Sequence, residues 1–341
     1  MPTNILLHGS GAIGTIYVYL LLQAGCSVTA VCRSNYEAAK ANGFTIDSDK
    51  YGQGVHVRPT QVARSLAEAA AQSTEAFDYV IVCTKALPEA RTAKLIQPAV
   101  TEGKTTIVLI QNGIGIENEY ASLFPSIPLL SCVVYLPTTQ ISPAHIQMGA
   151  IELLKIGTYP ASAYTPKHAK AATDFFLETV KRGGSDAHFY PEIQEQRWRK
   201  LLVNASWNPI CALTLSRDVA FLASSPSAES CVEGVMREAV AVAQALGYKS
   251  VTADMAAEQM ERATGRMGGR GIEPSMLVDV LSGRRMEVEV ILGEPVRIAR
   301  RLGVSVPRME TLYALGKGLD EAVARRRPGM SLGGDEAKAA A

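Results

Sequence analysis

The chain has 341 residues, of which 47% are hydrophobic and 20% are charged, and its formal net charge is +1. This length and composition are typical of a soluble globular protein with two domains. The near-neutral charge argues against a nucleic-acid partner, and no uncharged apolar run reaches the ~18 residues of a membrane span. The start, MPTNILLHGSG, has no basic segment, so no signal peptide is expected. The six cysteines form no Cys-x-x-Cys pair and are expected to be reduced thiols of a cytoplasmic protein.

The first elements predicted are a short strand, Asn4–His8, and a helix that runs to Ala24 and is ended by Gly25. A G-x-G-x-x-G pattern lies between them. Its first glycine allows a tight turn, its second lets the backbone approach a pyrophosphate, and its third lets the helix pack on the strand. The helix N-terminus offers N–H groups to the phosphates. We therefore predict a Rossmann-type domain whose cofactor contacts are Gly9, Ser10, Gly11, Ala12, Ile13 and Gly14.

The residue after the second predicted strand, Ser27–Cys32, indicates whether the site prefers NAD or NADP. An NAD site would normally place an acidic residue there to bind the ribose 2′-hydroxyl. This chain has Arg33 instead, which can pair with a 2′-phosphate. The pattern therefore predicts NADPH as the cofactor, although Arg33 could also be an ordinary exposed arginine.

Two further buried parallel strands, Phe77–Thr84 and Thr105–Gln111, are each followed by a polar residue. These residues are Lys85 and Asn112, and ligands bind at the carboxyl ends of strands in open α/β sheets. Each alone could be a helix cap or a turn former. Two at successive strand ends favour a binding site.

The rest of the first domain is expected to contain one hairpin, two strands and two helices, and to end at residue 190. His145 is interpreted as a loop or edge residue rather than a catalyst. The predicted elements are a hairpin at Asn42–Thr60, helices at Leu87–Val100 and Pro166–Arg182, and strands at Leu129–Tyr135 and Gln147–Gly157, before the closing segment Ala187–Tyr190.

From residue 191 the pattern changes to long helical periodicity. We predict a helical domain over 191–327 and a frayed tail over 328–341. A glycine-rich basic loop, Gly265–Gly271, interrupts it. The helices expected after the first are Ser227–Leu246, Ala253–Ala263, Ser275–Leu281, Glu289–Leu302 and Met309–Ala324.

The first helix of this domain, Arg197–Leu213, carries Lys200, Asn204 and Asn208 at i, i+4 and i+8, so they share one face. Their neighbours are mostly apolar, and buried polar groups need partners. The row is therefore either a wetted stripe on a surface helix or a line of ligand-binding groups. Pro209 predicts a kink or break inside this helix.

From about residue 4 to 320 the chain resembles the ketopantoate reductase (2-dehydropantoate 2-reductase) family. The resemblance rests on GSGAIG near the start, Lys85, QNGIG at 111–115, KLLVNASWNP at 200–209 and SMLVDVLSGRRME at 275–287. It implies an N-terminal Rossmann-type domain and an all-α C-terminal domain like that of 6-phosphogluconate dehydrogenase. It also implies NADPH-dependent reduction of 2-dehydropantoate to pantoate, a step of pantothenate biosynthesis.

The resemblance also implies roles for individual residues. Lys200 is then the general acid and Glu287 positions the lysine and the ligands, while Lys85 and Asn112 contact the nicotinamide side of the cofactor. Asn112 also faces the substrate. The remaining substrate-binding residues are Asn204, Asn208 and Ser275. These roles suit the chemistry, because a protonated lysine stabilises the alkoxide that forms when a ketone accepts a hydride.

Several positions depart from the family pattern. Met286 and Leu292 replace a threonine and an asparagine that we expect on the substrate wall, Ala144 replaces a glycine, and Trp207 adds a large ring. The substrate therefore remains open between ketopantoate and another 2-oxo acid, ketone or imine. A non-catalytic NADP(H) sensor is a third hypothesis, although Lys200 and Glu287 together argue against it. No membrane partner is expected, and a homodimer is left open.

Overall fold

The structure is a computed structural model that describes residues 2–164 and 167–325. The predicted tail, 328–341, lies outside the described residues. The chain forms two compact units. The first comprises the chain up to Asn112 together with Ile116–Ile193, and the second comprises Gly113–Gly115 and the chain from Gln194 onward. The expected domain change at 190/191 remains a proposal.

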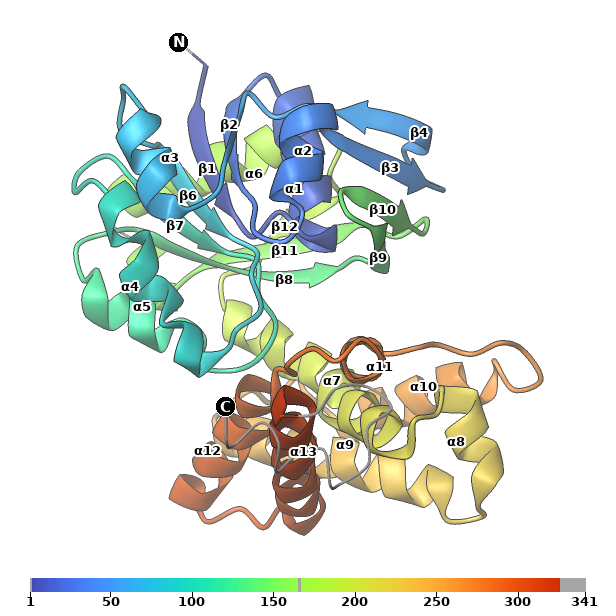
Figure 1. The fold of residues 1–341 in the computed structure, drawn as a ribbon. Coiled ribbons are helices and arrows are strands. Elements are labelled where there is room, and N and C mark those ends of the chain that lie inside the picture. The colour runs from blue at the N-terminus through green and yellow to red at the C-terminus, as the bar shows by residue number, and fades with distance from the viewer. Residues whose placement is uncertain (1, 165–166, 326–341) are drawn as a thin grey trace. The chain divides into compact units, whose positions relative to one another are not determined.

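The first unit is built on an eight-stranded sheet in the order β12-β11-β8-β7-β6-β1-β2-β5 (Figure 1). The six strands from β8 to β5 are parallel, and β11 runs antiparallel to β8. Its central strands are continuous apolar runs with nearly every residue buried, as expected where helices cover both faces. The strands are β1 (Asn4–His8), β2 (Ser27–Val31), β5 (Gln61–Ala63), β6 (Tyr79–Val82), β7 (Thr106–Leu109), β8 (Leu129–Tyr135), β11 (Leu153–Thr158) and β12 (Ala187–Phe189).

Helices α1 (Ala12–Gln23) and α6 (Lys167–Arg182) share one core cluster with the sheet. Tyr79 of β6 connects strand and helix, since its ring centroid lies 5.4 Å from that of Phe176 and its hydroxyl donates to the Ala172 carbonyl at 2.9 Å. The unit also contains four shorter helices, α2 (Tyr36–Asn42), α3 (Leu66–Gln72), α4 (Thr92–Ile96) and α5 (Asn118–Leu123). Only one of them, α4, falls within a predicted helix, Leu87–Val100, and the other three were not predicted.

The predicted helix Leu87–Val100 is only partly formed. It is divided into a 3-10 turn, Pro88–Ala90, then α4, then a second 3-10 turn, Gln97–Ala99. Arg91 adopts the left-handed backbone conformation, with φ of 45°, which stops one helix before the next begins.

A second, four-stranded sheet has the order β4-β3-β10-β9, with β3 (Phe44–Ser48), β4 (Gly52–Val57), β9 (Thr138–Ser142) and β10 (His145–Met148). It confirms the hairpin predicted over Asn42–Thr60. The single strand predicted over Gln147–Gly157 is wrong, because β10 and β11 belong to different sheets. His145, expected to be a loop or edge residue, follows a turn and is the first residue of the interior strand β10, and its Nε2 lies 2.7 Å from Asp47 Oδ2.

The second unit is helical. Its own apolar cluster includes Trp198, Leu202, Val232, Met236 and Ile291. The predicted helices are confirmed, while α8 and a π-helical turn, η4 (Glu289–Gly293), were not predicted. The helices are α7 (Ile193–Thr214), α8 (Asp218–Ser224), α9 (Ala228–Ala245), α10 (Ala253–Thr264), α11 (Ser275–Leu281), α12 (Glu294–Leu302) and α13 (Pro307–Arg325).

Helix α7 continues through Pro209, so of the kink or break expected there, the break does not occur. The turn around Pro209 is buried, and packing offsets the one missing hydrogen bond. The predicted fold class, a Rossmann-type α/β domain with an all-α domain, is confirmed.

No helix within the described ranges is long and apolar enough to cross a membrane. None of the six cysteines, all of which lie within the described residues, forms a disulfide, and four of them are buried: Cys26, Cys32, Cys132 and Cys211.

Candidate functional site

The predicted dinucleotide loop joins β1 to α1, and its three glycines meet different surroundings. Gly9 has φ of +98°, and a Cβ on it would lie 2.6 Å from the Thr84 backbone nitrogen. A Cβ on Gly14 would lie 2.2 Å from the Gly9 carbonyl oxygen. A Cβ on Gly11, in contrast, would meet nothing within 4 Å. Gly9 and Gly14 are therefore required by packing, whereas Gly11 keeps open the space beside the start of α1.

Helix α1 begins at Ala12 with Gly11 as its N-cap and no side-chain cap, so its first turn can offer N–H groups to an anion. Ser10 is buried, and its hydroxyl donates to the Val31 carbonyl at 3.3 Å. The Ser10 carbonyl accepts a hydrogen bond from Asn35 Nδ2 at 2.6 Å. The Ser10 side chain therefore holds the loop against β2.

Arg33 lies just after β2 and is exposed, as a residue that binds a phosphate must be. His8, at the end of β1, was not singled out from the sequence. Burial, and then the nearby Arg33 charge, lower the pKa of His8 to about 4, so its imidazole is neutral at neutral pH. Its Nδ1 is buried and has no hydrogen-bond partner within the described part of the chain.

Lys85 and Asn112 follow β6 and β7, which are adjacent parallel strands, so the structure places both at the carboxyl edge of the sheet. Gln111 connects the two strand ends, because its Nε2 donates to the Thr84 carbonyl at 2.8 Å. Lys85 and Asn112 are partly buried.

In the second unit, Lys200 and Asn204 project from α7 and are partly buried. Burial is the largest cause that lowers the pKa of Lys200 to about 7, and the positive charge of Arg197 lowers it further. The carboxylate of Glu287 acts in the opposite direction. At neutral pH, Lys200 can therefore exist both as an ammonium and as an amine, which suits a group that gives up a proton.

Asn208 lies one turn beyond Asn204 and is buried. Its Oδ1 accepts hydrogen bonds from Ser275 Oγ at 3.2 Å and from the Met276 backbone nitrogen at 3.3 Å. Asn208 therefore caps the first turn of α11 from another helix, and it brings two predicted substrate residues into contact. Ser275 itself is exposed.

From the sequence, Glu287 could also be a surface acid paired with Arg284 or Arg285, but it is only 8% exposed. Each of these two arginines contacts an aspartate. Arg284 lies 3.3 Å from Asp279, and Arg285 lies 2.6 Å from Asp320. Glu287 is close enough to Lys200 to raise the pKa of the lysine.

Met286 and Leu292 do not lie on an open substrate wall, which corrects the expectation from the sequence. They are 2% and 0% exposed and belong to the apolar core of the helical unit. Leu292 Cδ1 lies 3.9 Å from where a Cβ on Gly316 of α13 would be. Trp207 is buried in the same core. These departures from the family pattern thus change core packing.

Residues 113–115 belong to the helical unit although they follow a strand of the first unit. The Gly113 carbonyl accepts a hydrogen bond from Arg197 Nη1 at 3.1 Å, and the Ile114 nitrogen donates to the Val290 carbonyl at 2.8 Å. Gly113 has φ of +99°, and a Cβ on it would lie 2.4 Å from Val290 Cβ. The buried position of Arg197 was not predicted.

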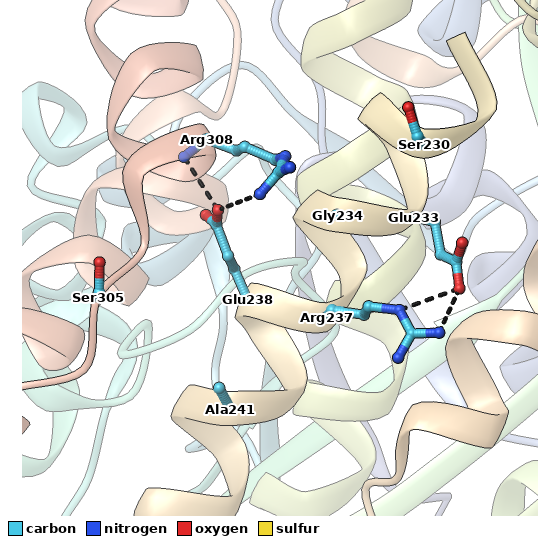
Figure 2. A pocket seen from close by; sticks show the side chains of 8 residues that line it. All are labelled: Ser230, Glu233, Gly234, Arg237, Glu238, Ala241, Ser305 and Arg308. Carbon is cyan, nitrogen blue, oxygen red and sulfur yellow. Dashed lines mark hydrogen bonds and ion pairs between the residues drawn. The ribbon is translucent and has the colours of Figure 1, made fainter. Parts of the chain in front are cut away.

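A surface pocket of about 380 Å³ lies between α9 and the start of α13 (Figure 2). Glu238 accepts from the backbone nitrogens of Arg308 and Met309 at 3.1 and 2.9 Å and so caps α13. Arg237 pairs with Glu233 at 2.6 Å. The charged groups of this pocket stabilise the helix contact, and no predicted site residue lines it.

Comparison with known proteins gives two family matches that together span most of the chain. The family described as ketopantoate reductase PanE/ApbA matches residues 5–161, and its C-terminal counterpart matches residues 192–320. The chain belongs to the ketopantoate reductase family.

Similar proteins from this family and fold cover nearly the whole chain. An uncharacterized protein of Saccharomyces cerevisiae is 32% identical over 92% of each chain. A 2-dehydropantoate 2-reductase of Nostoc is 26% identical over 92% of this chain and 93% of the relative. The crystal structure of 2-dehydropantoate 2-reductase from Methylococcus capsulatus is 34% identical in sequence. The match covers 96% of this chain and 100% of the other chain, with a TM-score of 0.80.

A D-mandelate dehydrogenase solved with NADH and anilino(oxo)acetate shares the fold, with a TM-score of 0.79 at 19% identity over 94% of this chain and 99% of that one. Membership of this family indicates that the chain is an oxidoreductase.

Proposed function

We propose that the protein reduces the 2-keto group of 2-dehydropantoate to the alcohol of pantoate with NADPH, as a cytoplasmic enzyme of pantothenate biosynthesis. The observation that carries this proposal is the Lys200 site. A partly buried lysine whose pKa is lowered to about 7 lies near the buried carboxylate of Glu287, on the same helix face as Asn204 and Asn208.

The first unit fits a dinucleotide. Gly11 leaves open space beside the uncapped start of α1, and Arg33 is exposed at the end of β2, where no acid would repel a 2′-phosphate. Lys85 and Asn112 are our candidates for the nicotinamide side. NADPH, when bound, supplies the hydride. The structure of D-mandelate dehydrogenase with NADH shows that the fold alone does not select the phosphate, so the preference rests on Arg33.

Lys200 would donate a proton from Nζ to the substrate oxygen as negative charge develops there. Its N–H bond breaks, the O–H bond of the product forms, and the lysine is left as a neutral amine. Glu287 favours the ammonium form before that step, since an opposite charge nearby stabilises the charged state.

Asn204, Asn208 and Ser275 would hold the substrate. Because Asn208 Oδ1 already accepts two hydrogen bonds, its amide nitrogen is the group that can donate to a carboxylate or hydroxyl oxygen. The exposed Ser275 hydroxyl, which donates to Asn208, can accept a hydrogen bond from a substrate hydroxyl. This arrangement suits a 2-oxo acid that carries a second polar group.

The test is kcat/KM for 2-dehydropantoate beside an analogue that lacks its 4-hydroxyl, with NADPH in excess. Met286 and Leu292 lie in the core, so these two apolar residues give no reason to expect tolerance for apolar analogues. We expect a preference of roughly ten- to a hundredfold for the hydroxylated substrate, because an unmet buried polar group costs ~1–3 kcal/mol.

Two other results would replace the proposal. If the analogue or another 2-oxo acid, ketone or imine is reduced and 2-dehydropantoate is not, the protein is a paralogous reductase. The D-mandelate dehydrogenase of the same fold is the observation that keeps this alternative open. If NADPH binds and no carbonyl is reduced, a non-catalytic NADP(H) sensor becomes the better explanation.

A further inference from the structure

Arg197 lies three residues before Lys200 on α7, which is one helical turn, so the two side chains share a face. It is only 4% exposed, and buried arginines are rare unless they are bound. One bond is the contact of its Nη1 with the Gly113 carbonyl. Arg197 is thus held on one side by the 113–115 loop and stands beside the proposed general acid.

The same loop is fixed from a second direction. The Ile114 nitrogen donates to the Val290 carbonyl, and Val290 follows Glu287 by three residues. Gly113 is also joined by one peptide bond to Asn112, so their Cα atoms are separated by only ~3.8 Å. The contacts of Arg197 and Val290 therefore fix the chain immediately after Asn112.

Two charged groups act on Lys200 from the elements packed around it. Arg197 acts from its own helix and Glu287 from the segment before η4, and their effects on the pKa of Lys200 are opposite. A guanidinium keeps its proton at every physiological pH, so the cost of two neighbouring positive charges is borne by the lysine.

We propose that Arg197 is a positioning residue for the proposed reduction, with two functions: its fixed charge prepares Lys200 to release a proton, and its guanidinium anchors the loop that follows Asn112. The inference rests on the proposed role of Lys200 as general acid. Proton transfer is fastest when the acid is neither too weak nor already deprotonated. Without the charge of Arg197, Lys200 would hold its proton more tightly.

Three substitutions separate the two functions. Arg197→Gln removes the charge but keeps an N–H donor for the Gly113 carbonyl. Arg197→Lys keeps the charge. Arg197→Met removes both charge and donor. Arg199→Gln is the matched control, because Arg199 lies two residues further along α7 and its Nη2 is 2.8 Å from both Glu195 Oε1 and Ser250 Oγ.

The first measurement is the pH dependence of Lys200 acetylation in the full-length protein, followed by mass spectrometry, which needs no turnover. Arg197→Gln should move the midpoint upward by about one pH unit, as expected for a like charge one turn away. Arg197→Lys and Arg199→Gln should leave it where it is in the unsubstituted protein. An unmoved midpoint in Arg197→Gln would overturn the electrostatic function.

The second measurement is the pH profile of kcat and the KM for NADPH. In Arg197→Gln the fall of kcat at alkaline pH should shift upward with the acetylation midpoint. Arg197→Met should in addition raise the KM for NADPH several-fold, through the loop at Asn112. Equal KM values for Arg197→Gln and Arg197→Met would overturn the anchoring function. If Arg197→Met does not fold, Arg197→Leu, which also removes both the charge and the donor, replaces it in this comparison.

The two proposals fail in different ways. If the unsubstituted protein reduces no 2-oxo acid, the proposed function fails, while the acetylation midpoints still report whether Arg197 acts on Lys200. If turnover is normal and the midpoints coincide, the proposed function stands and the inference about Arg197 is wrong.

Discussion

In the first unit, the predicted cofactor residues lie on loops at the edge of a sheet and in the first turn of α1, and the backbone around Gly9–Gly14 shapes the predicted site. In the second unit, the predicted catalytic and substrate residues project from α7 and its neighbours, and their proposed roles belong to their side chains. The difference predicts opposite sensitivities. The first site should be damaged by added atoms and lost surface charge, and the second by the removal of one partly buried functional group.

The largest effect is expected at Lys200. Lys200→Ala removes the proposed general acid and should lower kcat by ~10²–10⁴, because a positioned acid contributes about that much. NADPH affinity, measured by fluorescence titration, should stay near normal, since the proposed cofactor contacts lie mainly in the other unit. A variant that keeps most of its turnover would remove Lys200 from the mechanism and favour the sensor hypothesis.

A smaller effect is expected at Arg33. Arg33→Ala should weaken NADPH by ~1.5–3 kcal/mol, roughly ten- to a hundredfold, while NADH changes little. Dissociation constants for both cofactors give the answer. Arg58→Ala is the control, as Arg58 is another exposed arginine of the same unit and its Nη2 donates to the Ala41 carbonyl. Equal losses for NADPH and NADH would show that Arg33 does not recognise the 2′-phosphate.

The smallest effect is expected at Gly11, where a new Cβ meets no protein atom within 4 Å. Gly11→Ala should keep the melting temperature and weaken NADPH and NADH alike by about tenfold, ~1.4 kcal/mol, because the methyl group occupies space that a pyrophosphate needs. Gly14→Ala should instead lower the melting temperature, since its Cβ would lie 2.2 Å from the Gly9 carbonyl. Unchanged cofactor affinity in Gly11→Ala would place the phosphates elsewhere.

The elements that could be predicted from the sequence are those with a local cause. β1, β8 and α11 have the predicted bounds, because apolar runs and turn or cap residues define them within a few positions. The strand predicted over Gln147–Gly157 failed because sheet membership depends on distant partners. β10 pairs with β3 and β11 with β8, and nothing within the segment indicates which.

The site shows the same limit. The helical spacing of Lys200, Asn204 and Asn208 can be recognised locally, whereas the bond between Asn208 and Ser275 joins residues 67 positions apart. Arg197 was overlooked because it stands in a basic run with Arg199 and Lys200, and only packing shows that it is buried while Arg199 is partly exposed. The misplacement of Met286 and Leu292 arose in the same way, since a residue's position in a motif does not give the direction of its side chain.

The three residues Gly113–Gly115 belong to the helical unit but are flanked in the sequence by residues of the first unit. The chain passes from one unit to the other after Asn112, after Gly115 and after Ile193. Ile114 is 3% exposed and belongs to the apolar core of the helical unit. A fragment that starts at Gln194 would lack this side chain and carry a cavity, which typically costs ~2–5 kcal/mol for a lost isoleucine. The helical half is therefore not a separable module, and exchanging it between relatives would require the residues at 113–115 to be exchanged with it.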